Sequence, residues 1–221
     1  MPDANLMFLG PPGSGKGTQA VRLADALGLV QLSSGDALRR ERKRGSPVGQ
    51  EAARYMDAGT LVPDDVIMRV MLAQVDELPP GKGFILDGIP RTVPQAEALD
   101  RGLGERGLRL DAVVDFDVAD AEIIRRVVNR RVCGDCGATY NLASIPPRVD
   151  GVCDRCGKAL VHRPDDREEV VATRLSKYHE QTEPLIEYYR RRGLLVEVDA
   201  ARDADAIYED VLKIARRATR R

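Results

Sequence analysis

The sequence predicts a three-layer α/β protein in which helices cover both faces of a five-stranded parallel sheet. Short runs that are wholly or mainly apolar, as is typical of buried strands, alternate along the chain with segments whose apolar residues have helical spacing. Strands separated by helices in this way favour right-handed βα units. A chain of 221 residues is long enough for one such core with inserted segments.

Five apolar runs are the strand candidates. The first, at residues 6–9, ends at Gly10 and leads through a glycine-rich turn into a helix that Gly28 closes. Apolar residues recur at helical spacing between these two glycines, which indicates an amphipathic helix. The other four predicted strands are residues 30–32, 84–86, 113–116 and 194–198.

Two segments do not fit this alternation of strands and helices. Residues 33–62 form a polar helical stretch that Gly45, Pro47 and Gly59 break, and residues 130–166 are rich in Cys, Gly, Pro and Asp. Ligands bind beyond the carboxyl ends of the strands in open α/β sheets, so we expect both segments to be insertions at that edge. The remaining core is then expected to consist of residues 1–32, 63–129 and 167–221.

Charge and hydropathy exclude several classes of protein. The net charge of −1 provides no basic field for nucleic acid or for an anionic membrane surface. No apolar run approaches the roughly 20 residues that a membrane span needs. The first ten residues lack a basic start followed by a long apolar stretch, so no signal peptide is expected. Together these features predict a cytoplasmic protein without nucleic-acid or membrane partners.

The glycine-rich turn, GPPGSGKGT at residues 10–18, predicts a phosphate site. Glycines allow the backbone N–H groups of the loop and of the following helix to approach an anion closely. Lys16 adds charge near the outer phosphates and Thr18 can help to place magnesium. Gly17 separates these two residues, unlike the strict Walker A string, but the strand before and the helix after favour phosphate binding over a surface turn. The expected ligands are Gly13, Ser14, Gly15, Lys16, Gly17 and Thr18.

The cysteines predict a structural metal site. They form two CxxC pairs, Cys133 with Cys136 and Cys153 with Cys156, with sixteen residues between the pairs. Four thiolates suit tetrahedral zinc, although iron also accepts such a set, so the identity of the metal stays open. All four coordination positions would come from protein, which predicts a structural role. Reduced thiols again favour the cytoplasm.

Three further strings carry a family resemblance: SGDALR at 34–39, DGIPRTVPQ at 87–95, and RPDD at 163–166 with Arg174 beyond it. With the glycine-rich loop, they resemble adenylate kinase of the bacterial long-lid, zinc-containing type, in matching order over nearly the whole chain. The resemblance implies a P-loop fold with an AMP-binding insertion at 33–62 and a zinc-binding lid at 130–166. It implies the reaction ATP + AMP ⇌ 2 ADP, with magnesium.

For the acceptor nucleotide, the resemblance implies that Arg39 and Arg91 grip the AMP phosphate and that Gln95 hydrogen-bonds the base. Ser34 stands where the family usually has threonine, and Ile89 replaces a common phenylalanine. The AMP-binding set that the resemblance implies is Ser34, Arg39, Thr60, Leu61, Val62, Gly88, Ile89, Pro90, Arg91, Gln95, Arg163 and Arg174.

For the donor nucleotide, the resemblance adds Arg126, Arg130, Thr139, Tyr140 and Arg202 to the loop residues. Asp87 matches the acidic residue that holds magnesium through water. The acceptor is already an anionic phosphate, so no general base is required, and arginine forks suit the neutralisation of phosphate charge. The catalytic set that the resemblance implies is Lys16, Arg39, Arg91, Arg130, Arg163, Arg174, Asp87 and Asp165.

Two alternatives remain at this stage. Paired CxxC motifs also occur in nucleic-acid-binding zinc ribbons, but the near-neutral charge and the 4% aromatic content disfavour that class. A sister kinase acting on UMP, CMP or GMP is the second alternative, and the choice between ATP and GTP as donor is open. The resemblance suggests a monomer.

Overall fold

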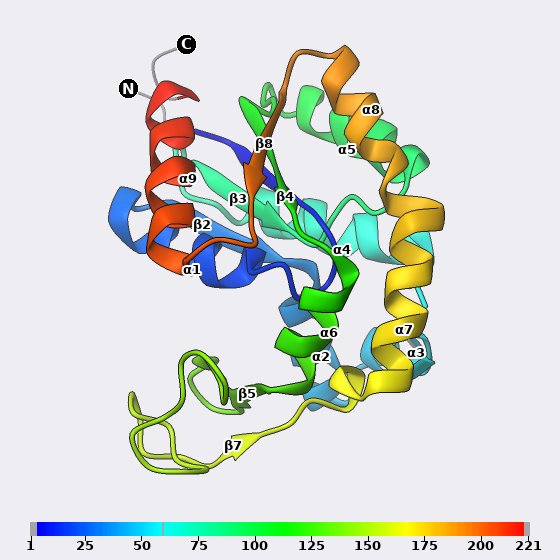
Figure 1. Cartoon of the computed structure of the whole chain (residues 1–221). Helices are drawn as coiled ribbons and strands as arrows, with labels where there is room; N and C mark the ends of the chain where they lie inside the picture. Colours follow the sequence, from blue (N-terminus) through cyan, green and yellow to red (C-terminus); the bar gives the residue numbers. More distant parts are fainter. Residues whose placement is uncertain (1–3, 59, 219–221) are drawn as a thin grey trace.

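The structure is a computed structural model that describes residues 4–58 and 60–218. Residues 1–3 and 219–221, which are the ends of the expected core, and Gly59, an expected break in the polar insertion, lie outside the described residues. At the centre is a five-stranded parallel sheet with the strand order β2-β3-β1-β4-β8, and helices pack on both of its faces (Figure 1). The predicted fold class is therefore confirmed.

The strands of this sheet are β1 (Leu6–Leu9), β2 (Val30–Ser33), β3 (Phe84–Asp87), β4 (Ala112–Asp117) and β8 (Leu195–Asp199). All five predicted strands are present. The last one begins one residue later than predicted, although the carbonyl of Leu194 still accepts a hydrogen bond from the Val113 amide at 2.9 Å. Leu194 thus still takes part in the hydrogen bonding of the sheet, although the strand itself spans Leu195–Asp199.

The helices connect these strands and flank the two insertions. In chain order they are α1 (Lys16–Leu27), α2 (Ser34–Arg44), α3 (Pro47–Ala58), α4 (Asp64–Asp76), α5 (Val93–Gly104), α6 (Asp120–Val128), a 3₁₀ turn (Pro164–Asp166), α7 (Glu168–Lys177), a π-helical turn (Tyr178–Thr182), α8 (Pro184–Arg191) and α9 (Ala204–Ala218).

Successive side chains of β1 point to opposite faces of the sheet, and the apolar core forms one layer on each face. Leu6 and Phe8 face a cluster that includes residues of α1 and α9, whereas Met7 and Leu9 face a cluster built with α4, α5 and α8. All four side chains are at most 2% exposed, because β1 is the central strand and has helices on both sides. Figure 1 shows α1 and α9 on one side of the sheet and α5 and α8 on the other.

Apart from Ser33, which ends β2, neither expected insertion contributes to the main sheet. The first contains α2 and α3, which meet where Gly45, with φ 69°, closes α2. The second contains an antiparallel sheet of the order β6-β5-β7, formed by β5 (Arg130–Cys133), β6 (Thr139–Asn141) and β7 (Leu160–Val161). Figure 1 shows this small sheet as a separate lobe, joined to the rest of the molecule through α6 on one side and the start of α7 on the other.

Candidate active site

The phosphate loop lies between β1 and α1, where the sequence predicts it. Gly13 has φ 84°, and a Cβ atom at this position would lie 2.3 Å from Val127 Cγ2, so only glycine fits. Helix α1 begins after Gly15 with no side-chain cap and no acidic residue in its first turn. Its free N–H groups and its dipole therefore favour an anion at this end.

Lys16 is held by the loop that it follows. Its Nζ donates hydrogen bonds to the carbonyl oxygens of Gly10 at 2.7 Å and Pro11 at 2.6 Å, and it lies 3.1 Å from Ser14 Oγ. The pKa of the Lys16 amine is lowered to about 8, chiefly by burial; the Asp87 carboxylate opposes this shift and the Arg91 guanidinium adds to it. The amine thus lies at the cleft floor, beside the helix terminus that favours an anion.

Asp87 ends β3 next to the start of α1. A Cβ atom on Gly17 would lie 3.3 Å from Asp87 Oδ2, and Gln31 Nε2 donates to the same oxygen at 3.2 Å. Burial raises the pKa of this carboxyl. Carboxylate and hydroxyl oxygens are the ligands that magnesium prefers, so Asp87 and Thr18 fit a magnesium ion that accompanies a bound triphosphate.

The predicted arginines converge on one cleft of about 590 Å³ above this loop. Burial, and next the Arg174 guanidinium, lower the pKa of Arg91 to about 10. Burial, followed by Arg39 and Arg130, has the same effect on the pKa of Arg163. Guanidiniums that disfavour one another's charge form a strongly positive site, which suits clustered phosphates. The predicted arginines that line the cleft are Arg39, Arg91, Arg126, Arg130, Arg163, Arg174 and Arg202.

Two adjacent carboxylates orient the arginines at the base of the small lobe. Asp166 is fully buried, accepts from Arg130 Nε at 2.8 Å and lies 3.6 Å from Arg174 Nη1. Asp165, a predicted catalytic residue, accepts from Arg174 at 3.1 Å and lines the second cavity described below. These carboxylates fix the orientation of the Arg130 and Arg174 guanidinium groups, which face the cleft.

A second, smaller cavity of about 70 Å³ contains most of the predicted acceptor set. Gln95 is 2% exposed, and its Oε1 accepts from the Arg91 amide at 2.7 Å while its Nε2 donates to Asp64 at 2.6 Å. Ser34 Oγ donates to the Gly88 carbonyl at 2.8 Å. The members of the predicted set that line this cavity are Ser34, Arg39, Thr60, Leu61, Val62, Gly88, Arg91, Gln95 and Arg174.

Three members of the predicted acceptor set lie elsewhere. Ile89 is 1% exposed and belongs to the apolar core beside the sheet, so it lines neither cavity. Pro90 and Arg163 line the large cleft and not the small cavity. In the segment at residues 88–91, therefore, only Ile89 packs in the core, and the other three residues line a cavity.

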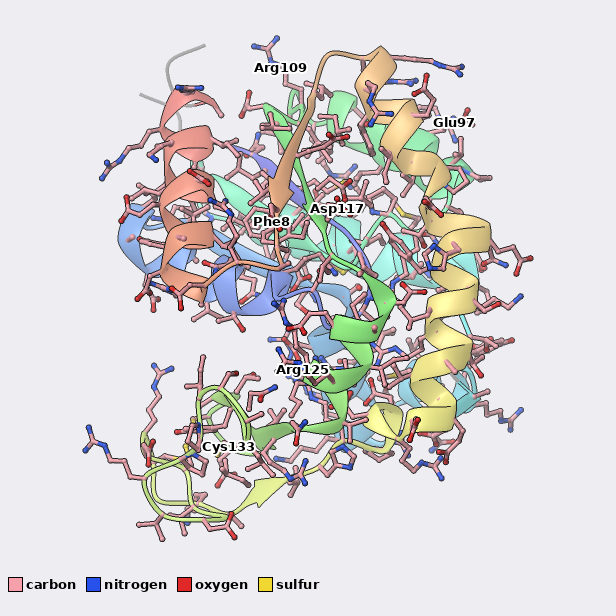
Figure 2. The ribbon with its side chains drawn as sticks, in the orientation of Figure 1. Phe8, Glu97, Arg109, Asp117, Arg125 and Cys133 are labelled. Atoms are coloured by element: carbon pink, nitrogen blue, oxygen red, sulfur yellow. The ribbon has the colours of Figure 1, made fainter. Side chains whose placement is uncertain are left out.

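The predicted donor-side residues line the large cleft. Arg126 Nε donates to Glu122 at 2.7 Å, and its Nη1 donates to the Ala200 carbonyl at 2.8 Å. Arg125, next to it and labelled in Figure 2, has a side chain that is 66% exposed. Thr139, Tyr140 and Arg202 also line this cleft. Both neighbouring arginines of α6 line the cleft and bond Glu122, but Arg126 is the more buried and also bonds Ala200 across the cleft.

The four cysteines gather in the small lobe, where Figure 2 labels Cys133. One sulfur atom from each cysteine lies within 4.8 Å of all the others. Cys133 Sγ is 3.3 Å from Cys156 Sγ, and Cys136 Sγ is 3.5 Å from Cys153 Sγ. Four thiol groups at this spacing fit one tetrahedral zinc ion, and they leave no position for water or substrate.

Sequence reasoning missed three carboxylates near the site. Asp166 and Glu122 orient arginines, and the sequence offers little to single them out because acidic neighbours are common in both segments. Asp115 is different, since it interrupts an otherwise apolar strand. It is 4% exposed, and its Oδ1 has no hydrogen-bond partner among the described residues. Burial, followed by the charge of Asp117, raises the pKa of Asp115 to about 6.

Of the helices in the described part of the chain, none has both the length and the hydropathy that a membrane crossing needs.

Comparison with known proteins gives one consistent result. A family model described as "Adenylate kinase" matches residues 8–194. A protein of Symbiobacterium thermophilum named adenylate kinase is 50% identical over 215 residues, covering 96% of this chain and 98% of that protein. Proteins of the same name from Archaeoglobus fulgidus and Methanothrix thermoacetophila are 46% identical over 207 residues and 44% identical over 210 residues. These alignments cover 94% and 95% of this chain, and 95% and 97% of those proteins.

Proposed function

The chain belongs to the adenylate kinase family. On that premise, we propose where its two nucleotides bind and which residues take part in phosphoryl transfer. It catalyses reversible transfer of a phosphoryl group from ATP to AMP, which gives two ADP. The observation that carries the assignment of roles is a shared wall: Arg39, Arg91 and Arg174 each line both the large cleft and the small cavity. Two phosphates that meet at this wall face the same guanidiniums.

The chemistry requires this arrangement of charge more than it requires a reactive side chain. Phosphoryl transfer passes through a loose transition state whose charge is spread over the equatorial oxygens. The acceptor phosphate is already anionic, so no base has to remove a proton from it. Lys16 and the arginines hold the two phosphates in line against their mutual repulsion and cancel the charge that develops. Asp87 and Thr18 would hold the magnesium ion that accompanies ATP, and this ion would neutralise part of the same charge.

We assign AMP to the small cavity. Its polar wall offers Arg39 and Arg91 to the phosphate, and Ser34 and Gln95 to the base. The amide of Gln95 already bonds Arg91 and Asp64, which fixes the plane of its side chain before any nucleotide binds. Such preorganisation reduces the entropy cost of binding.

We assign ATP to the large cleft, with its phosphates on the loop from Gly13 to Thr18. Arg126, Thr139, Tyr140 and Arg202 then contact the adenosine end. The lobe at residues 130–166 acts as a lid that closes over ATP and excludes water, and residues 33–62 close over AMP. Closure of this kind protects the transferred group from hydrolysis.

We propose that the cysteine cluster holds a structural zinc ion, with iron as the alternative that metal analysis would test. The support is the chemistry and spacing of the four thiols. The described part of the lid buries few large apolar side chains, so the metal replaces a core. We also propose that the protein works as a monomer in the cytoplasm, which light scattering and cell fractionation would test.

A coupled assay of ADP formation tests the reaction. We expect turnover with ATP and AMP, and much less with CMP, UMP or GMP in place of AMP. Turnover with one of these and none with AMP would move the chain to a sister class. Comparing ATP with GTP measures the donor preference. Arg91→Ala should reduce kcat by about 10²–10³-fold, the effect of removing a charge-stabilising donor. Arg101→Ala, an exposed position on α5, is the matched control and should leave kcat unchanged.

A further inference from the structure

Tyr140 lies among the cysteines of the lid. It is 8% exposed and belongs to a small cluster in which Cys133 and Cys153 are also buried, with Leu160 packed against them. It is the largest side chain of that cluster. The resemblance implies a contact with ATP for this residue, which lines the large cleft. Its hydroxyl group, however, bonds within the lid.

The hydroxyl of Tyr140 bridges to the second cysteine pair. Its oxygen lies 2.8 Å from the backbone nitrogen of Asp154 and 3.5 Å from Cys153 Sγ. A backbone N–H can only donate, so the oxygen accepts the first bond and its single proton is left for the sulfur. A hydrogen bond to an ionised sulfur is charge-assisted and therefore stronger than one to a neutral thiol.

Chain connectivity makes this bridge significant. Cys133 ends β5 and Cys136 lies in the turn before β6, so the first pair belongs to the same hairpin as Tyr140. Cys153 and Cys156 come from a separate turn that follows it in sequence. The hydroxyl thus ties the hairpin to the backbone and to one sulfur of that turn. Groups that orient metal ligands in this way commonly affect metal affinity nearly as strongly as the ligands do.

We propose that Tyr140 is a positioning residue of the metal site, whose hydroxyl orients the Cys153 thiolate and holds the two CxxC turns in register. This rests on the metal site proposed above and does not depend on the kinase reaction. All three residues of strand β6, Thr139, Tyr140 and Asn141, line the large cleft. The same strand therefore joins the metal site to the wall of the ATP cleft.

The test compares two tyrosine-to-phenylalanine substitutions in the full-length protein. Tyr140→Phe removes the bridging oxygen and keeps the ring. Tyr189→Phe is the matched control, because Tyr189 is fully buried in the core and its hydroxyl has no hydrogen-bond partner among the described residues. Zinc affinity is measured by competition with a chromogenic chelator. Absorption spectra of the cobalt-substituted proteins report the sulfur–metal bonds, and circular dichroism reports the folding of the core.

We expect Tyr140→Phe to weaken zinc binding by about 10–100-fold, the usual effect of losing a partner that orients a ligand. We also expect it to shift the sulfur-to-cobalt absorption band, which a purely packing role would leave in place. Tyr189→Phe should change neither property. Unchanged zinc affinity and an unchanged band in a folded Tyr140→Phe protein would overturn the role of Tyr140 alone. A parent protein that binds no zinc would overturn the metal site together with that role.

Discussion

Asp166 forms a buried ion pair with Arg130: its carboxylate is fully buried and accepts a hydrogen bond from Arg130 Nε at 2.8 Å. Arg174 Nη1 lies 3.6 Å from the same carboxylate, which thus serves two arginines of the phosphate site. The charge of the carboxylate faces cations that are themselves largely withdrawn from water. Both the stability and the activity of the protein should therefore depend on it.

Asp166→Asn tests this dependence. The substitution preserves shape and removes the charge, so the partly buried guanidinium of Arg130 loses its carboxylate partner, whereas Arg174 keeps Asp165 at 3.1 Å. We expect the free energy of unfolding in urea to fall by about 3 kcal/mol, as when one partner of a buried pair is removed. kcat should also fall, because the carboxylate that orients the Arg130 guanidinium is lost. The control is Glu169→Gln, since Glu169 is exposed and forms only a loose pair at 3.6 Å with Arg167. Losses below about 1 kcal/mol, typical of a surface pair, would contradict the role of Asp166.

Gly13→Ala should disable the phosphate loop. The added methyl group would meet Val127 at 2.3 Å, and the backbone φ of 84° is one that side chains rarely adopt. The loop must shift, so its N–H groups no longer point at the bound phosphate. We expect kcat/KM for ATP to fall by at least about 10²-fold, the effect of losing one preorganised donor. Gly104→Ala is the control, because a methyl group there meets no atom within 4 Å. Normal ATP kinetics in Gly13→Ala would refute the geometry given for the loop.

Asp115→Asn should stabilise the protein at neutral pH. Burial raises the pKa of Asp115 from 3.8 to about 6, so the folded state binds the proton more tightly than the unfolded state does. The ionised carboxylate therefore costs stability as the pH rises from about 4 to 6, and this cost persists above pH 6. At about 1.4 kcal/mol for each pKa unit, asparagine should add up to about 3 kcal/mol to the free energy of unfolding at pH 8. Near pH 4 the gain should disappear.

Urea unfolding of Asp115→Asn at pH 4, 6 and 8 measures this effect. Asp25→Asn, on the exposed face of α1, is the control and should change stability little at any of these values. A gain that is the same at pH 4 and pH 8 would show that packing, and not charge, explains the difference.

The main elements of the fold were predictable because their signals are local. Apolar runs alone locate all five strands, and the glycines between residues 6 and 28 locate the loop and the limits of α1. Directions of side chains were not predictable, because they depend on contacts distant in sequence. Asp165 and Asp166 are adjacent, yet only Asp166 is fully buried between two arginines. Likewise, no sequence pattern indicates that the hydroxyl of Tyr140 meets a cysteine.

Affinity for ATP should fall as the pH rises through about 8. Lys16 has its pKa lowered to about 8 by burial, so in the free enzyme the amine loses its charge above that value. The phosphates are already fully ionised there, since their second pKa is near about 6. Titration calorimetry with a non-hydrolysable ATP analogue between pH 7 and 9.5 measures the loss. Lys16→Arg keeps a cation throughout and should bind with little pH dependence. An affinity that stays constant in the parent protein would contradict the lowered pKa.

Removal of the metal should unfold the lid and spare the core. In the described part of the lid, the buried side chains of its cluster are Cys133, Tyr140 and Cys153, which is too little apolar surface to hold three short strands without the metal. The main sheet keeps two apolar layers of its own. Hydrogen exchange should therefore become fast in β5 to β7 after treatment with a zinc chelator, and remain slow in β1 and β4. Magnesium is added back in excess, so that only the loss of the tightly bound metal is tested, and zinc should restore protection. Persistent protection of β5 and β6 in verified metal-free protein would show that the lid folds without the metal.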